Sequence, residues 1–346
     1  MKQCKRIICS ATMAEENVQT NTTRVLVTGA NGFIGSHLCR SLLAHGFKVI
    51  AGVRNGANLE NLKDVDVSYV YGDITKSETL AKLISSADVV LHNAGLVKSK
   101  SLARMIEVNT SGTEALFDAC VKSEHVKRFV FISSLSACGP SSGKPRVEDD
   151  EPAPLTDYGR SKLNAERALL KRAAELNLQI VRPPAVYGPG DREILAFFQT
   201  VRRGIRPAIG NTGRRLNMVY VDDLAEGVAR LLEHDLQSGN IYFLSESQSY
   251  TFAEMMDHIG VAVERRGISL PVPGWALKSL GAVSETAFKL VGAAPMLTLG
   301  KARELLSSWE VSVARARADF NFAPATSFPE GARITAAWYR EHGWLK

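Results

Sequence analysis

A phenol and an ammonium group four residues apart form the most reactive pair that the sequence offers. Tyr158 and Lys162 lie in a segment with helical spacing, and a helix would place both side chains on one face. A free tyrosine titrates at about pH 10, too high for easy proton exchange at neutral pH. A neighbouring positive charge favours the phenolate, so we expect Lys162 to lower the pKa of Tyr158 and to suit it to general acid/base catalysis. The alternative interpretation is a solvated helix face without chemistry.

Hydroxyl side chains end the apolar segment that precedes this helix. The segment Phe129–Ser133 predicts a buried strand, and Ser134 follows it directly. In open α/β sheets, ligands bind beyond the carboxyl ends of the strands. Ser134 is therefore placed to hydrogen-bond a substrate carbonyl and to stabilise a developing oxyanion. A serine that only caps a turn is the alternative, and Ser133 and Ser136 are the neighbours that could be mistaken for it.

The elements that must position these groups alternate between strand and helix. Short β-branched segments predict strands, and longer segments with helical spacing predict helices. The predicted strands span residues 24–28, 48–53, 67–71, 88–92, 129–133 and 178–182, and the predicted helices span 33–45, 79–85, 103–123 and 158–177. This alternation predicts an α/β fold, a Rossmann-type parallel sheet wound by helices on both sides.

Three glycines connect the first predicted strand to the first predicted helix. Gly29, Gly32 and Gly35 let the turn tighten and let backbone N–H groups approach a pyrophosphate at the positive end of the helix. Glycines in this context predict a dinucleotide site, whereas a plain glycine-rich turn is the alternative. The residues of the loop that we expect to contact the dinucleotide are Gly29, Asn31, Gly32, Phe33, Ile34 and Gly35.

The end of the second predicted strand indicates which dinucleotide binds. NAD enzymes usually place an acidic residue there to hold the ribose 2′-hydroxyl, but this strand ends in Val53 and Arg54. Arg54 can pair with a 2′-phosphate through its planar guanidinium, so NADP(H) is favoured over NAD(H). An exposed surface arginine is the alternative. Asp73 and Ile74, after the third strand, are expected to flank the adenine, although Asp73 could equally cap the next helix.

From about residue 183 the pattern loosens into loops rich in proline and glycine. Residues 219–245 return to a strand followed by a helix and one more strand. We therefore expect an NADP-binding Rossmann domain over 23–182, joined by 219–245. A smaller, mainly helical substrate-binding lobe would comprise 183–218 and 246–346, and residues 1–22 are predicted to be a disordered extension.

Composition excludes several classes of protein. A chain of 346 residues with 45% hydrophobic residues can bury a core, and it has no apolar run of roughly 18 residues that would predict a membrane span. Its five cysteines lack a Cys-x-x-Cys pair and suit neither disulfides nor a metal site, which favours a cytoplasmic protein with reduced thiols. The net charge of +6 is scattered without a nucleic-acid motif, so nucleic acid is not an expected partner.

Together these motifs resemble the extended short-chain dehydrogenases/reductases of the epimerase/dehydratase superfamily. The glycine loop, the serine pair and the Tyr158–Lys162 pair occur in the order found in that family. The match runs from about Arg24 to the C-terminus, and the set is far more specific than any single motif. Further segments in the family's order are Gly72–Ile74, His92–Gly95, Val108–Asn109, Arg182–Pro183 and Val221–Ala225.

The resemblance implies a role for each candidate residue. Tyr158 would protonate the carbonyl oxygen during reduction, Lys162 would also hold the nicotinamide ribose, and Ser134 would orient the carbonyl. Asn109 would make a polar contact near the active site. Besides Tyr158 and Lys162, the cofactor contacts that the resemblance implies are Ala94, Gly95, Ser133, Pro183, Ala185 and Val186.

Departures from the family pattern narrow the range of expected substrates. Dehydratases carry an Asp-Glu pair after the catalytic hydroxyl, whereas Leu135 and Ser136 stand there in this chain. Ala185 replaces an asparagine that nucleotide-sugar enzymes usually have. The chain instead resembles the dihydroflavonol-reductase-like and 3β-hydroxysteroid-dehydrogenase-like branches, which act on apolar alcohols and ketones. An apolar stripe within Trp275–Val291 is interpreted as core, as the wall of an apolar pocket, or as a face that touches a membrane.

The function predicted from these features is NADP(H)-dependent hydride transfer to the carbonyl of an apolar small molecule, or from its alcohol. A nucleotide-sugar epimerase with tightly bound NAD is one alternative, and a non-catalytic dinucleotide-binding scaffold or redox sensor is another. Relatives often dimerise through the helices that correspond to Ala103–Ser123 and Tyr158–Asn177, so the resemblance allows a homodimer.

Overall fold

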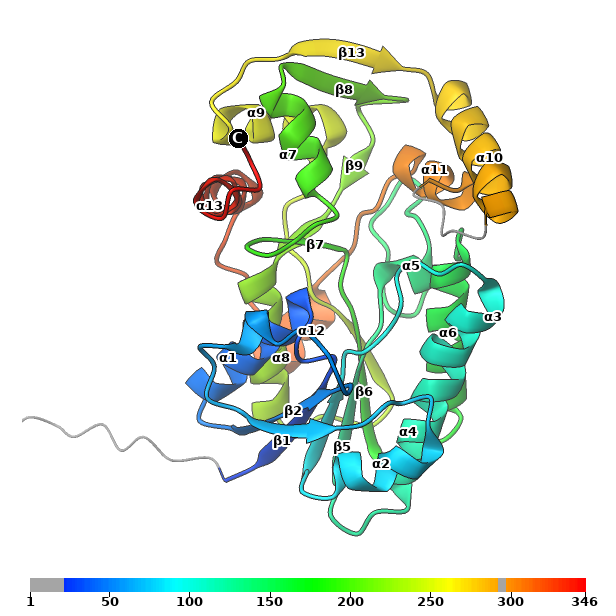
Figure 1. Cartoon of the computed structure of the whole chain (residues 1–346), viewed down its shortest axis with the longest axis vertical. Helices are drawn as coiled ribbons and strands as arrows, with labels where there is room; N and C mark the ends of the chain where they lie inside the picture. Colours follow the sequence, from blue (N-terminus) through cyan, green and yellow to red (C-terminus); the bar gives the residue numbers. More distant parts are fainter. Residues whose placement is uncertain (1–21, 292–296) are drawn as a thin grey trace, which may run out of the picture.

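The computed structural model describes residues 22–291 and 297–346, so nearly all of the predicted extension over residues 1–22 lies outside the described residues. Seven parallel strands form one sheet with the order β11-β6-β5-β4-β1-β2-β3 (Figure 1). The strands are β1 (Arg24–Thr28), β2 (Lys48–Val53), β3 (Ser68–Tyr71), β4 (Val89–His92), β5 (Arg128–Ile132), β6 (Asn177–Arg182) and β11 (Asn240–Phe243). The predicted Rossmann-type doubly wound fold is confirmed.

Helices cover both faces of this sheet because its central strands are apolar on both sides. Strands β4 and β5 are buried along their whole length, as expected of a parallel sheet between two helical layers. One face packs against α1 (Phe33–Ala44), α8 (Val221–Glu233) and α12 (Ala314–Phe320). The other face packs against α2 (Ser77–Ile84), α4 (Gly112–Val121) and α6 (Asp157–Leu170).

The helix predicted over residues 103–123 is interrupted. The chain forms α3 (Leu102–Ile106), then a π-helical turn over Glu107–Ser111, and only then α4. Such turns are rare and are frequently found at functional sites. Here the turn presents Asn109 to the neighbouring Leu96 and Ser161, a contact that periodicity alone cannot reveal.

The second lobe lies above the carboxyl edge of the sheet, as Figure 1 shows. It contains helices, as predicted, and also three two-stranded sheets that the sequence did not predict. Its helices are α7 (Leu195–Arg202), α9 (Phe252–Ala262), α10 (Gly274–Val291), α11 (Leu299–Leu306) and α13 (Phe328–Glu341). Its strands are β7 (Ala185–Tyr187), β8 (Ile205–Ile209), β9 (Arg215–Leu216), β10 (Met218–Tyr220), β12 (Tyr250–Thr251) and β13 (Ile268–Val272).

An aromatic core holds this lobe together. Tyr187, Phe198, Phe328 and Tyr339 are fully buried, and their rings meet edge to face, a favoured geometry for aromatic pairs. The lobe is thereby fixed as a packed body rather than a set of loops. Within the described ranges, no helix combines the length and the apolar character needed to cross a bilayer.

Candidate active site

The turn between β1 and α1 has the shape that a pyrophosphate requires. Gly29 adopts a φ of +67°, and a side chain there would meet the Cα of Ala94 at 3.0 Å. A Cβ at Gly35 would lie 2.1 Å from the carbonyl oxygen of Gly29. Gly32 caps α1 without a side-chain hydrogen bond, so the first amides of the helix remain available for an anion. The glycines therefore keep a cradle open that any side chain would fill.

A cavity of about 320 Å³ adjoins this turn on the side of β2 and β3. Arg54, Asp73 and Ile74, the residues predicted to surround the adenosine, all line it, and we call it the adenosine cavity. Burial opposes ionisation of Asp73, but hydrogen bonds from Thr75 and the charges of Arg54 and Arg104 outweigh burial and lower the pKa of the carboxyl. Arg104, on α3, is a second cation in this cavity that the sequence analysis missed, because nothing in its local pattern separates it from a surface arginine.

A second cavity of about 430 Å³ continues the groove toward β5 and β6, and the two cavities share Asn93 and Gly95. The predicted residues in its lining are Phe33, Ile34, Gly95, Ser133, Ser134, Tyr158, Lys162, Pro183 and Val186. Ala185 lies outside the lining of both cavities, whereas Pro184 lies in it. Successive residues of a strand point to opposite sides, and in β7 the cavity side belongs to Val186.

Lys162 lies at the floor of this second cavity. Its Nζ donates to the carbonyl of Ile132 at 2.9 Å and lies 4.6 Å from the ring centre of Phe131. Burial lowers the pKa of Lys162 to about 8, although the charge of Glu166 opposes that shift. A Cβ on Gly95 would lie 3.3 Å from the same Nζ, so the absence of a side chain there leaves the ammonium open to the groove.

The pKa of Tyr158 is shifted in the direction opposite to the one expected. Burial raises the pKa of Tyr158 to about 12, the nearby carboxylate of Glu304 adds to the rise, and the Ser134 hydroxyl opposes it. We expected Lys162 to lower this pKa, but desolvation of the phenolate outweighs any such effect while the ammonium is held by a backbone carbonyl. Tyr158 is therefore held in its protonated form, as a proton donor must be.

Ser134 and Asn109 both have structural partners. Ser134 caps the short helix α5 (Leu135–Cys138) by accepting from the amide of Ser136 at 3.1 Å, and it also lines the cavity beside Tyr158. The side chain of Asn109 is buried and saturated: it bonds both backbone groups of Leu96 and the hydroxyl of Ser161. Asn109 is thus a positioning residue that fixes the loop after β4 against α6.

A buried ion pair supports the catalytic helix from behind. Glu166 accepts from Arg182 at 3.0 and 2.6 Å and from the hydroxyl of Ser133, and both charged side chains are almost fully buried. Glu166 was not among the residues predicted from the sequence, although it follows Tyr158 and Lys162 at the same four-residue spacing. The signal that could have identified Glu166 is a charged residue on the face of the helix that is predicted to be buried.

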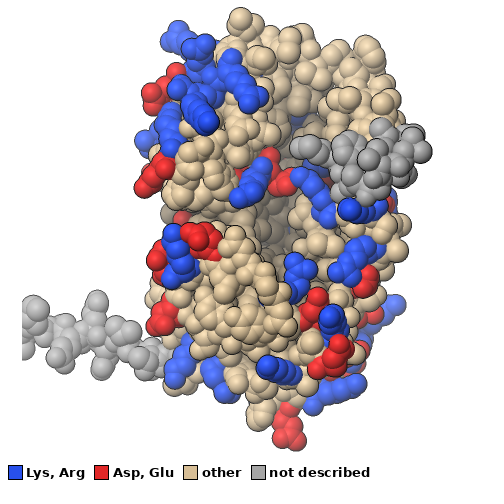
Figure 2. All heavy atoms as spheres, in the orientation of Figure 1, with Lys and Arg blue, Asp and Glu red and all other residues tan. Residues whose placement is uncertain are grey.

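A third cavity of about 370 Å³ opens between the sheet domain and the second lobe, and it shares Tyr158, Val97 and Glu193 with the second. Figure 2 shows a hollow in the middle of the molecule, between the two halves. Charged side chains are prominent in its lining, notably Lys98, Arg160, Lys301, Arg303 and Glu304. The cavity is therefore more polar than the expected apolar pocket, because α11 turns its charged face toward Tyr158.

Among the residues whose side chains are described, no member of the stripe predicted within Trp275–Val291 lines this cavity. Leu277 packs into the core of the second lobe, whereas Trp275, Leu280 and Val283 are exposed, and Glu285 is the residue of α10 that lines the cavity. The stripe members Ala287, Phe288 and Val291 lie outside the residues whose side chains are described.

The three cavities are neighbours that share lining residues, and Tyr158 lines both the second and the third. The first suits an adenosine, the glycine turn suits a pyrophosphate, and the second ends among Tyr158, Ser134 and Lys162. A substrate in the third cavity would meet the phenol directly. The arrangement can therefore place a hydride carrier on one side of a carbonyl and a proton donor beside its oxygen.

Comparison with known proteins agrees with this geometry. The model of the NAD dependent epimerase/dehydratase family matches residues 25–244. The chain is 33% identical to ceramide reductase of Caulobacter vibrioides over 93% of this chain and 96% of that protein. It is 29% identical to UDP-glucose 4-epimerase of Vibrio cholerae over 90% of this chain and 94% of that protein. The crystal structure of gox2253 superposes with a TM-score of 0.79 at 25% identity, covering 94% of this chain and 100% of that one.

The matched residues include the glycine turn, Ser134, Tyr158 and Lys162, and the relatives are matched over almost their whole length. The family resemblance inferred from the motifs is confirmed, and with it the α/β fold of a dinucleotide-dependent enzyme. The chain belongs to the NAD-dependent epimerase/dehydratase family, the extended short-chain dehydrogenases/reductases.

Proposed function

We propose that the protein is an NADP(H)-dependent oxidoreductase that interconverts a ketone and a secondary alcohol on an amphiphilic substrate. The observation that carries this proposal is the position of Tyr158, which lines both the dinucleotide groove and the third cavity, with Ser134 beside it and Lys162 on the groove side. No acid pair for water elimination stands next to Ser134, because Leu135 is buried in the core and residue 136 is a serine.

The residues divide the reaction among them. When bound, the dinucleotide supplies or accepts the hydride. Ser134 donates a hydrogen bond to the carbonyl oxygen, which polarises it and stabilises the charge that develops there. Tyr158 transfers its proton to that oxygen, and its raised pKa keeps the proton available until then. Proton transfer leaves a phenolate on Tyr158. The ammonium of Lys162 stabilises this phenolate once it has turned away from the carbonyl of Ile132.

The lining of the third cavity argues for a substrate that is apolar only in part. Its basic and acidic side chains can hold a polar head group beside Tyr158, while Val97, Met105 and Leu299 offer apolar contacts. The similarity to a ceramide reductase supports a long-chain keto compound with a polar head. This refines the apolar ketone that the sequence suggested.

Replacing Tyr158 with Phe tests the proposal. We expect Tyr158→Phe to lose turnover by at least about 100-fold, the usual contribution of a positioned acid, while it binds NADPH as before. Substrates to screen are long-chain keto compounds, steroids, flavonoids and nucleotide sugars, each with NADPH and NADH. Tyr69→Phe, on the exposed strand β3, is the matched control. If Tyr158→Phe retained full turnover or cellular function, a binding scaffold would be the better interpretation.

A nucleotide-sugar epimerase remains the second candidate, and one observation favours it. Arg160, Lys301 and Arg303 line the third cavity and could bind a diphosphate, and the Vibrio relative is an epimerase. An epimerase would interconvert sugar nucleotides without net consumption of cofactor and would retain NAD through purification. Release of NAD on denaturing the purified protein, with no turnover of added NADPH, would select this candidate.

We further propose that the protein prefers NADP(H), that the chain divides into the two domains predicted from the sequence, and that the protein is a cytoplasmic homodimer. Arg54 and Arg104 in the adenosine cavity support NADP(H). The membership of β11 in the sheet and the packing of α8 against it support joining residues 219–245 to the dinucleotide domain 23–182, although β10 at the start of that segment pairs with β7 of the lobe. Residues 183–218 and 246–346 are left as the substrate lobe, except that α12 packs against the sheet. Three described cysteines are buried and free, which supports a cytoplasmic location. The family resemblance supports a homodimer through the helices that contain α4 and α6.

A further inference from the structure

Two copies of the tripeptide Arg-Arg-Gly lie side by side at the end of the second lobe. Arg202 is the last residue of α7 and residues 203–204 follow it, and residues 265–267 come shortly after α9. The carbonyl of Gly204 accepts from the amide of Ile268 at 2.8 Å, which fixes the two segments against each other. The guanidinium of Arg265 lies 3.6 Å from the position of a Cβ on Gly204. Segments far apart in the sequence thus bring four arginines to one place.

Apolar side chains follow directly on the paired strands. Ile205 of β8 and Ile268 of β13 are register partners, and they are 41% and 81% exposed. Leu270, two residues further along β13, is 52% exposed. Scattered exposed apolar residues are ordinary, but neighbouring ones that form a patch indicate an interaction surface.

The apolar surface continues onto α10, to which β13 leads. Trp275, Leu280 and Val283 are 74%, 60% and 66% exposed. Figure 2 shows Lys and Arg side chains gathered at the upper left of the molecule, and a surface almost free of charge along the rest of its upper end. We call these arginines and apolar residues the β13 surface.

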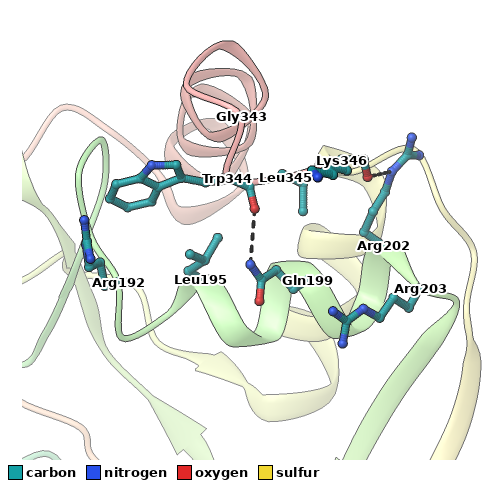
Figure 3. A pocket seen from close by; sticks show the side chains of 9 residues that line it. All are labelled: Arg192, Leu195, Gln199, Arg202, Arg203, Gly343, Trp344, Leu345 and Lys346. Carbon is teal, nitrogen blue, oxygen red and sulfur yellow. Dashed lines mark hydrogen bonds between the residues drawn. The ribbon is translucent and has the colours of Figure 1, made fainter.

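Three of the four arginines of this surface are available to a partner, whereas Arg202 donates to the carbonyl oxygens of Lys346 and Val263. Among the described residues, Arg203, Arg265 and Arg266 form no ion pair with a carboxylate. The nearby acids are engaged elsewhere, because Glu264 pairs with Arg340 and Asp257 pairs with Arg206. The groove beside α7 adds further positive charge, and Figure 3 shows Arg203 directed away from the C-terminal residues that close the groove.

We propose that the β13 surface binds the surface of an anionic lipid bilayer. Arginines beside exposed tryptophan and branched aliphatic residues suit the boundary between head groups and acyl chains. A second copy bound through the same surface would offer these arginines no free carboxylate, because the nearby acids Glu264 and Asp257 are already paired, and this disfavours a dimer as the occupant. A zwitterionic lipid surface has no net negative charge to attract the arginines.

This surface adjoins the active site, and that part of the inference rests on the proposed function. Helix α10 carries Trp275 and Val283 outward, and its Glu285 lines the cavity next to Tyr158. An amphiphilic substrate could therefore pass from the bilayer to the cavity along one helix. Membrane binding itself does not depend on which reaction the protein catalyses.

Sedimentation with lipid vesicles tests the proposal without a substrate. The purified full chain is mixed with vesicles of phosphatidylcholine, alone or with phosphatidylglycerol at about one third of the lipid, at low and high salt. We expect binding only to the anionic vesicles, and weakening at high salt. Each arginine near such a surface contributes about fivefold in affinity, so reversing Arg203, Arg265 and Arg266 to Glu should cost at least about 100-fold.

Matched variants separate this surface from the net charge. Lys48→Glu, Lys63→Glu and Lys122→Glu together change the charge equally at exposed positions of the sheet domain, and we expect this triple variant to keep most of the binding. The fluorescence of Trp275 should shift to the blue on anionic vesicles, and Trp275→Phe should remove that shift. Equal losses in both triple variants, equal binding to neutral vesicles, or no binding at all would overturn the proposal. Vesicle binding with no reductase activity would reject only the proposed function.

Discussion

The proposed preference for NADPH over NADH can be tested at one exposed guanidinium. Arg54 stands at the end of β2, lines the adenosine cavity and forms no ion pair with a carboxylate among the described residues. Arg104 lines the same cavity but is paired with Glu107 at 2.7 Å. Arg54 is therefore the freer cation for a 2′-phosphate, and Arg54→Ala is the informative change.

The size of the effect follows from the exposure of Arg54. A hydrogen bond to a charged group contributes about 1.5–3 kcal/mol, and solvent around an exposed side chain favours the lower end. About 1.5–2 kcal/mol corresponds to a loss of about 10- to 30-fold in NADPH affinity. Arg104→Ala should cost less, about threefold, because Glu107 already competes for the guanidinium.

Dissociation constants for NADPH and NADH, measured by calorimetry at fixed salt, give the answer without a substrate. We expect Arg54→Ala to weaken NADPH binding and to leave NADH within about twofold. Arg167→Ala, at an exposed position of α6 on the outer side of the molecule, serves as the control for lost surface charge. An equal loss for both cofactors, or a wild-type protein that prefers NADH, would refute the assignment of Arg54 to the 2′-phosphate.

Three further changes test the electrostatics of the site. Glu304→Gln removes a negative charge that raises the pKa of Tyr158. The absorbance of the Tyr158 phenolate should therefore appear at lower pH in this variant, with Tyr158→Phe as the blank. An unchanged titration would contradict the inferred effect of Glu304 on Tyr158. Glu166→Gln breaks a buried ion pair and should cost about 3–5 kcal/mol in the free energy of unfolding by urea, whereas Glu60→Gln, in an exposed pair, should cost at most about 1 kcal/mol. Burial lowers the pKa of His92 to about 3, against an ordinary value of 6.5; the unfolded chain therefore binds a proton in that interval that the folded chain refuses, and stability falls with falling pH. His92→Gln should reduce that slope by about 1.4 kcal/mol per pH unit, and an equal slope in both proteins would show that His92 does not titrate as inferred.

The sequence by itself determined the sheet and the cofactor turn. Strands such as β1 and β4 are short apolar segments whose composition fits only a buried strand. Gly29 and Gly35 occupy positions where a side chain would collide with the backbone. Local constraints of this kind restrict which residue types can occupy a position, so they can be recognised in the sequence. The order of the motifs along the chain was enough to predict the family and the groove.

Only the tertiary structure decided the electrostatics of the site and the character of the substrate cavity. The pKa of Tyr158 depends on burial and on Glu304, which lies 146 residues away in sequence. The π-helical turn that aims Asn109, and the two arginine segments that meet at Gly204, also join parts of the chain that no local pattern connects. Desolvation and through-space charge depend on which elements pack together, and that packing is a property of the whole fold rather than of any one segment.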